Sequence, residues 1–176
     1  PEVSNPLASM VSTLFCKAKS AERKNKFFLA ILDHFQTKMF KSETSSFHYF
    51  SQMIPKIKKV WCAVDCGIVI NPDAAINMIQ GGVIDGIGHA MYSELTFNDG
   101  ATNQTNFDSY QLIRHDQAPE SIEVFFVNSD VAPTGLGEPG LPPAIGALAN
   151  ALYKATGERF SRQPFINQMR KTIPLG

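Results

Sequence analysis

The chain has 176 residues, of which 44% are hydrophobic and 18% are charged, and its formal net charge is zero. These values are typical of one globular domain with a core of its own, and three cysteines are too few for a disulfide scaffold. The sequence holds no run of about 18 apolar residues, so we expect no membrane span.

Positive charge is concentrated at the start of the chain, where residues 1–60 hold ten of the 16 Lys and Arg residues. A nucleic-acid or membrane contact is one explanation, and a solvated helix face is the other. Because no nucleic-acid-binding motif accompanies the cluster, we favour the helix face and expect no nucleic-acid partner.

The first predicted element is helical. Within residues 1–46, apolar side chains from Phe27 to Met39 recur at helical spacing and form one stripe. A domain over residues 47–176 follows. Its first elements are an aromatic-rich strand over residues 47–53 and a second strand over residues 57–64, and a hairpin is the simplest pairing of the two.

A helix is predicted next, because Asn71 is a suitable N-cap and Pro72 suits the first helical position. The Gly81-Gly82 pair either interrupts this helix or allows it to approach a neighbour closely. Gly86 and Gly88 continue the small-residue side, which indicates close approach to another element or to a bulky ligand.

The C-terminal half predicts fewer and shorter elements. We expect a polar turn at residues 98–100, an extended segment over residues 107–114 and a strand over residues 122–128. A helix over residues 143–155 closes at Gly157, and an extended piece over residues 160–165 leads to a surface tail. The fold class is therefore α+β, a mixed sheet with packed helices.

Several residues invite a functional interpretation but have a plainer structural one. Cys62 and Cys66 lie four apart and face one side of a strand, but no His or Cys partner lies at ligand spacing, so buried apolar roles are favoured over a metal clip. We expect His89 to be a core or boundary histidine and Trp61 to be core.

The glycine-rich stretch from Thr134 to Pro143 surrounds a single carboxylate, Glu138. Gly135, Gly137 and Gly140 permit unusual backbone angles or close contact with a ligand, and the prolines stiffen the loop. A placed catalytic group is one interpretation, and an ordinary turn leading into a helix is the other.

Taken in order, the stretches at residues 64–73, 80–88, 106–110, 135–139 and 155–157 resemble one family. They are similar to the C-terminal part of the large, molybdenum-cofactor-binding subunit of the xanthine dehydrogenase and aldehyde oxidase family. Within that family the resemblance is to the branch of the isoquinoline 1-oxidoreductase beta subunit and related bacterial aldehyde dehydrogenases. It covers residues 57–166, so we expect the chain to be a portion of a longer subunit.

The resemblance implies a molybdenum hydroxylase that oxidises an N-heterocycle or an aldehyde with water as the oxygen source. It implies molybdenum held by molybdopterin cytosine dinucleotide, and [2Fe–2S] clusters on a separate small subunit. The implied partners are this small subunit, the remainder of the large subunit and a small-molecule substrate.

The resemblance also assigns roles to residues. Glu138 corresponds to the base that takes a proton from a Mo–OH group, and Gly137 lies in the loop that approaches the cofactor. A cofactor-binding Gln of the family falls at Met78, whose thioether cannot donate a hydrogen bond. Gln80 is a substitute candidate, although it faces another side of the helix. No residue is assigned as a metal ligand.

Two rival interpretations remain. One is a catalytically inactive structural or partner module derived from the family, which the Met78 departure and the short chain favour. The other is an unrelated helix-rich binding protein in which the Gly-Glu-Pro sequence is incidental. Because most cofactor contacts of the family lie outside the matching segment, we expect the isolated chain to be inactive.

Overall fold

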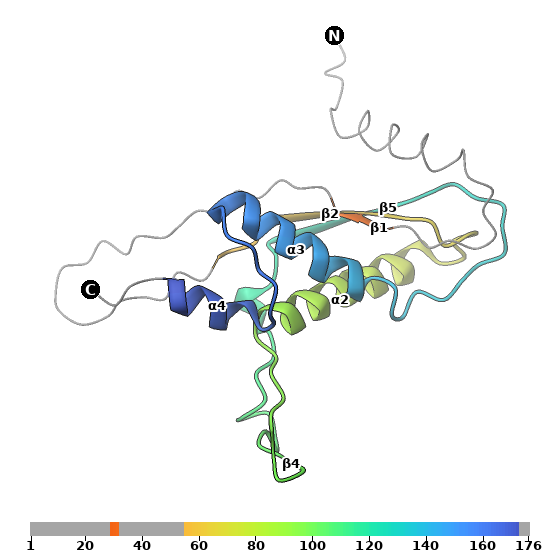
Figure 1. The fold of residues 1–176 in the computed structure, drawn as a ribbon. Coiled ribbons are helices and arrows are strands. Elements are labelled where there is room, and N and C mark those ends of the chain that lie inside the picture. Colours follow the sequence, from red (N-terminus) through yellow and green to blue (C-terminus); the bar gives the residue numbers. More distant parts are fainter. Residues whose placement is uncertain (1–28, 32–54, 173–176) are drawn as a thin grey trace.

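The computed structural model describes residues 29–31 and 55–172 (Figure 1). The strands are β1 (Leu29–Ile31), β2 (Lys59–Val64), β3 (Phe97–Asn98), β4 (Ala101–Thr102) and β5 (Ser121–Phe126). The helices are α2 (Pro72–Met91), α3 (Leu141–Thr156), α4 (Phe165–Thr172) and the 3₁₀ turn η1 (His115–Gln117).

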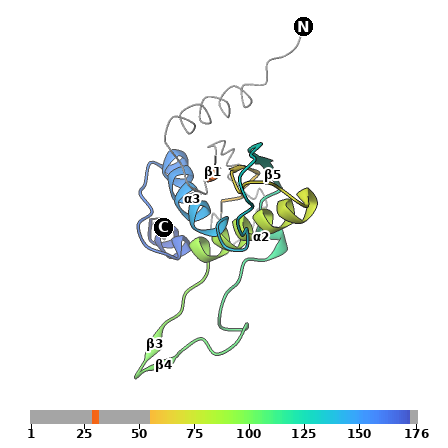
Figure 2. The same cartoon turned by 90° about the vertical axis from the view of Figure 1, so that its right-hand side faces the viewer.

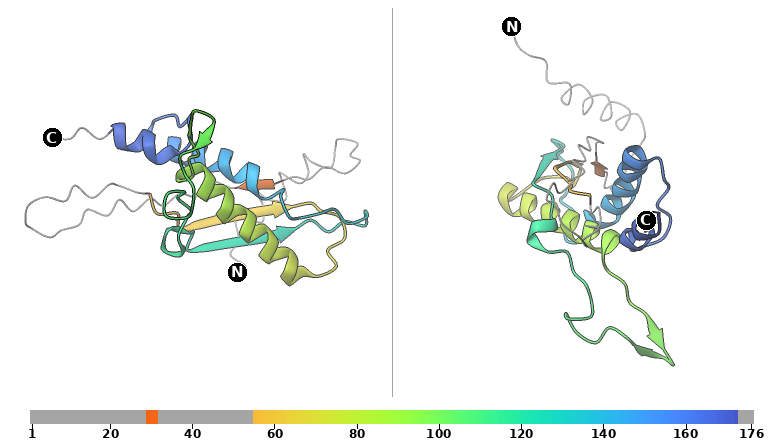
Figure 3. Two further views of the ribbon diagram at one scale, coloured as in Figure 1. Left: turned by 90° about the horizontal axis from the view of Figure 1, so that it is seen from below. Right: turned by 90° about the vertical axis from the view of Figure 1, so that its left-hand side faces the viewer.

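The main sheet has the strand order β1-β2-β5. β1 pairs with β2 in the antiparallel direction, whereas β5 pairs with β2 in parallel, from Lys59 opposite Ser121 to Val64 opposite Phe126. The strands predicted over residues 57–64 and 122–128 are thus confirmed, with ends displaced by one or two residues. Figure 3 shows β2 and β5 side by side, with α2 crossing one face.

The N-terminal helix prediction is wrong where the structure can test it, because residues 29–31 form a strand. A short apolar run fits a strand as well as a helix, and pairing with β2 gives these residues inter-strand backbone hydrogen bonds. The remainder of the 1–46 segment, the predicted strand over residues 47–53 and its hairpin lie outside the described residues.

Helix α2 starts as predicted: the Asn71 side chain accepts a hydrogen bond from the Ala74 N–H at 3.1 Å, and Pro72 follows it. The Gly81-Gly82 pair does not interrupt it, and the helix continues for 20 residues. Instead, its small residues allow α3 to approach. A Cβ at Gly86 would lie 2.5 Å from the Leu141 carbonyl oxygen, so the two helices cross nearly backbone to backbone.

The core lies between the sheet and helices α2 and α3. Its fully buried large side chains come from β2, α2 and α3; they are Val64, Ile79, Val83, Met91 and Leu152, together with Cys62. Trp61 is 7% exposed and Cys66 is 3% exposed, so the predictions of buried roles for Trp61, Cys62 and Cys66 are confirmed.

A narrow arm around β3 and β4 projects away from the body (Figure 2). Its turn has positive φ angles at Asp99 (47°) and Gly100 (82°), which is the backbone that a tight hairpin requires. The expected extended segment over residues 107–114 forms no strand, because a turn that bonds the Tyr110 N–H to the Asn106 carbonyl begins it. Phe97 and Phe107 on this arm are exposed.

Helix α3 agrees with the prediction, and Gly157 ends it with a φ of 78°. The extended piece predicted over residues 160–165 ends where α4 begins at Phe165, and the predicted surface tail forms this helix over residues 165–172. Phe165 and Ile166 are 3% and 4% exposed, so their burial against the core stabilises this short helix. Among the described residues, none of the helices has the length and apolar character needed to cross a membrane.

Candidate functional site

Two of the predicted site residues, Gly137 and Glu138, lie in the segment between β5 and α3, which leaves the sheet at one edge. β2 and β5 run in parallel, so the loops that follow them leave from the same edge. Helices α2 and α3 begin on that side too, at the right of Figure 1. In sheets with parallel strands this carboxyl edge is where ligands are commonly bound.

The two loops at this edge are joined by backbone hydrogen bonds. The Ile68 N–H donates to the Val131 carbonyl at 3.0 Å, and the Thr134 N–H donates to the Cys66 carbonyl at 2.9 Å. Gly67 lies between them with a φ of 75°, and a Cβ there would be 2.4 Å from the Ala132 carbonyl oxygen. Only glycine fits this position, so the strand-end loop and the start of the glycine loop form one unit.

The glycine loop, residues 134–140, rests on α2 at its far end. A Cβ at Gly140 would lie 3.3 Å from the Ile79 carbonyl oxygen, so this glycine allows the loop to contact the helix. Gly135 has open space around it, and a Cβ at Gly137 would meet only an ordinary van der Waals contact. The open side at these two glycines leaves the backbone accessible to a bulky group, as a cofactor-binding loop requires.

Glu138 is exposed, and its backbone carbonyl accepts a hydrogen bond from the Leu141 N–H at 3.0 Å. This bond ties it to the first turn of α3. The side chain of Leu136, two residues earlier, packs on the core. Glu138 therefore extends from a loop that is anchored on both sides and that turns directly into α3. Both interpretations of the sequence, a placed catalytic group and an ordinary turn before a helix, fit this arrangement.

The N-terminus of α3 offers few hydrogen-bond donors to an anion. Pro142 and Pro143 have no N–H, and the Leu141 N–H is already used by Glu138. A helix start normally presents four unsatisfied N–H groups, so these prolines remove two of them. An anionic group bound at this edge would therefore receive hydrogen bonds from the loop backbone more than from the start of α3.

Met78 and Gln80 project from different sides of α2, because two residues turn a helix by about 200°. Met78 is 48% exposed, and its methyl group faces Gly137, where a Cβ would lie 3.8 Å away. Met78, Gly137 and Glu138 are therefore brought together by the fold.

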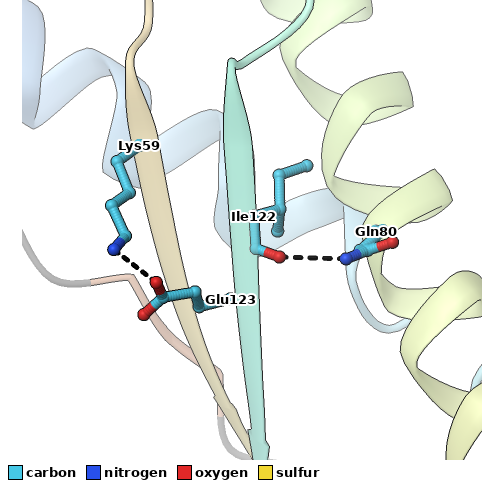
Figure 4. A network of polar contacts seen from close by, with 4 residues as sticks. All are labelled: Lys59, Gln80, Ile122 and Glu123. Atoms are coloured by element: carbon cyan, nitrogen blue, oxygen red, sulfur yellow. Dashed lines mark hydrogen bonds and ion pairs between the residues drawn. The ribbon is translucent and has the colours of Figure 1, made fainter.

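Gln80 has a partner elsewhere. Its side-chain amide donates to the Ile122 carbonyl of β5 at 2.9 Å (Figure 4). β5 is an edge strand of the described sheet, so this bond satisfies a carbonyl that no neighbouring described strand reaches. On the same strand, Glu123 forms an ion pair with Lys59 of β2. The Nζ atom of Lys59 also lies 5.0 Å from the centre of the Trp61 ring.

The other reactive groups are inert or peripheral. Burial raises the pKa of the Cys62 thiol to about 12 and also raises that of Cys66, so both are neutral thiols at ordinary pH. His89 is half-buried, as expected of a boundary histidine, and its Nε2 lies 3.7 Å from an Asp85 carboxylate oxygen. Within residues 55–172, no three His, Cys, Asp or Glu side chains form a group suited to a metal ion.

An apolar rim that was not predicted from the sequence lies at this edge. Ile68, Ile70 and Val131 are 47%, 81% and 48% exposed, on the two loops that the Cys66 and Val131 hydrogen bonds join. The available signal was the run Ile68-Val-Ile70 placed after a strand and before a helix cap. Apolar residues in such a loop, where no core can bury them, mark a surface that contacts a ligand or another part of a protein.

Several known proteins are similar to this chain in sequence or in fold. The model of the molybdopterin cofactor-binding domain matches residues 52–119. Isoquinoline 1-oxidoreductase subunit beta of Brevundimonas diminuta is 33% identical over 121 residues, which are 67% of this chain. The chain belongs to the molybdopterin cofactor-binding, xanthine dehydrogenase and aldehyde oxidase family.

Two further proteins are similar to this chain, one in sequence and one in fold. The nicotine 6-hydroxylase large subunit of Paenarthrobacter nicotinovorans is 36% identical over 57% of this chain. The aldehyde oxidoreductase of Desulfovibrio desulfuricans has the same fold over 70% of this chain, with a TM-score of 0.58 and 22% identity. The chain spans 15%, 13% and 14% of the lengths of these three proteins.

Proposed function

We propose that this chain is part of the large subunit of a molybdenum hydroxylase that oxidises an N-heterocycle or an aldehyde. The observation that carries the proposal is the position of Glu138, exposed on an anchored, side-chain-poor loop at the carboxyl edge of two parallel strands. The relatives include an isoquinoline 1-oxidoreductase, a nicotine hydroxylase and aldehyde oxidoreductases, which supports both substrate classes.

The net reaction replaces a C–H bond by a C–O bond to an oxygen derived from water, with loss of two electrons and two protons. When bound, the molybdenum cofactor supplies the two-electron oxidation and activates the water. Glu138 is the base that receives the proton of that water, which makes the oxygen nucleophilic. General-base catalysis of this kind contributes about 10²–10⁴ in rate.

The residues at the edge fit the approach of a large cofactor. Gly135 and Gly137 expose backbone without close side-chain obstruction, and Met78 lies beside Gly137. We assign the loop backbone around Gly137, with Met78, to the cofactor side of the site. Gln80 contributes to that site indirectly, since its amide N–H holds β5.

The proposed cofactor form and partner subunit are based on the resemblance to the same branch of the family. We propose molybdopterin cytosine dinucleotide as the form and a small subunit with [2Fe–2S] clusters as the electron acceptor from the site. The names of two relatives, a subunit beta and a large subunit, are consistent with a split enzyme of this kind.

A catalytically inactive module of the family is the second candidate. The observation that favours it is Met78, whose thioether stands where an amide that both donates and accepts would be expected. Under either candidate we expect the 176-residue chain alone to retain no molybdenum and to show no turnover. Stoichiometric molybdenum and activity in the isolated chain would contradict this.

The deciding experiment replaces Glu138 by Gln in the intact enzyme that contains this chain. We expect turnover to fall by at least about 100-fold while the molybdenum content is unchanged, since Gln keeps the shape but cannot accept the proton. Glu120→Gln is the matched control, because Glu120 is also exposed but precedes β5 at the opposite end. Equal rates for the two variants would remove Glu138 from the mechanism.

A further inference from the structure

The loop that carries Glu138 is fixed at both ends by contacts that do not involve Glu138 itself. At the start, the Thr134 N–H is bonded to the Cys66 carbonyl, and Leu136 packs on the core. At the end, Gly140 lies directly on α2. Between these anchors, Gly137 and Glu138 are exposed.

One side chain reaches this exposed part from the helix below. The methyl group of Met78 lies beside Gly137, because a Cβ built on Gly137 would be 3.8 Å from Met78 Cε, the range of ordinary van der Waals contact for such a Cβ. Gly137 directly precedes the residue whose side chain is the proposed base. An unbranched thioether suits this place, because it adapts to an irregular backbone surface.

We infer that Met78 is a positioning residue, which supports the loop at Gly137 and thereby fixes the direction of the Glu138 side chain. The inference rests on the proposed function of Glu138. It gives the Met at this position a role of its own: a thioether packs on the loop without competing for the hydrogen bonds that a cofactor or substrate requires. Met78 then acts through Glu138.

The Leu141 N–H group can report whether Met78 supports the loop. From Pro139 to Pro143, only Gly140 and Leu141 have an N–H, and the Leu141 N–H donates to the Glu138 carbonyl. Hydrogen exchange of a peptide that spans these residues therefore measures how firmly Glu138 is held. The Thr134 amide, bonded to Cys66, serves as an internal reference at the other end of the loop.

The test compares Met78→Ala, Met78→Leu and Leu95→Ala in the 176-residue chain. Leu95→Ala is the matched control, because Leu95 is 49% exposed and Met78 is 48% exposed. It removes a similar apolar surface, but on the arm and away from the loop. We expect Met78→Ala to speed exchange at Leu141 by about fivefold, with exchange at Thr134 and the melting temperature unchanged. Met78→Leu should restore slow exchange, and Leu95→Ala should have no effect.

Two results would overturn the inference. One is equal exchange at Leu141 in Met78→Ala and Leu95→Ala. The other is faster exchange throughout α2 and α3 in Met78→Ala, which would show a general structural role.

In the intact enzyme, Met78→Ala should lower kcat with KM unchanged, and Met78→Leu should restore it. A Met78→Gln variant that gains cofactor retention without changing exchange at Leu141 would show a direct cofactor contact instead. A fully active Glu138→Gln enzyme would refute the proposed function, yet it would leave the exchange result intact, so the two failures are distinguishable.

Discussion

The crossing of α2 and α3 gives a sharp prediction, because two glycines of one helix should respond to the same substitution in opposite directions. Gly81 has open space, whereas a Cβ at Gly86 would lie 2.5 Å from the Leu141 carbonyl oxygen and 3.1 Å from Ala144 Cβ. Alanine is favoured over glycine in a helix interior by about 0.5–1 kcal/mol. Gly81→Ala should therefore stabilise the chain by about that amount.

Gly86→Ala has the same gain in helix propensity but must displace a backbone carbonyl. To reach 3.4 Å, α3 would have to move by roughly 0.9 Å, and this movement would loosen the packing of Leu148 and Leu152 on the core. Overpacking of this kind costs about 1–3 kcal/mol, and rigid backbone offers little relief. We expect a net loss of about 1–2 kcal/mol.

The assay is thermal and urea unfolding of the three proteins, followed by far-ultraviolet circular dichroism. For a chain of this size 1 kcal/mol shifts Tm by about 2–4 °C. Gly81→Ala should melt about 2 °C above the parent chain, and Gly86→Ala about 2–8 °C below it. If Gly86→Ala is as stable as Gly81→Ala, the close crossing of the two helices is refuted.

Three further predictions concern the edge of the sheet and the core. Gly67→Ala should destabilise the chain by at least about 2 kcal/mol in urea unfolding, because the positive φ and the Ala132 carbonyl oxygen, 2.4 Å from the new Cβ, both oppose the side chain. A loss of stability below about 0.5 kcal/mol would contradict the close packing of the two loops. Asn71→Ala should cost about 1 kcal/mol through loss of the N-cap. Asn77→Ala, exposed inside the same helix, is the control that should not destabilise the chain, because alanine has the higher helix propensity. Because burial raises the pKa of Cys62 to about 12, the folded chain keeps this thiol neutral while the unfolded chain ionises it above about pH 9. Stability should then fall by about 1.4 kcal/mol per pH unit from pH 9 towards 12, and an equal fall in Cys62→Ala would refute this cause.

The sequence by itself determined the elements whose signals are local. Asn71 and Pro72 start α2, Gly157 ends α3, and the apolar periodicity of α3 lies between its ends, because capping and helical spacing act within a few residues. The motif order also identified the family and placed Glu138 in the loop before α3.

The tertiary structure decided what depends on contacts between distant residues. Leu29–Ile31 is apolar in a pattern that suits a helix, and only the pairing with β2 makes it a strand. Likewise, Phe165 and Ile166 form a helix because the core is there to bury them. The fold brings together residues 50 or more positions apart. Gly82 and Gly86 lie against the start of α3, Gly67 lies against the Ala132 loop, and Met78 lies beside Gly137. No periodicity of the chain encodes these separations, since they depend on how completed elements pack.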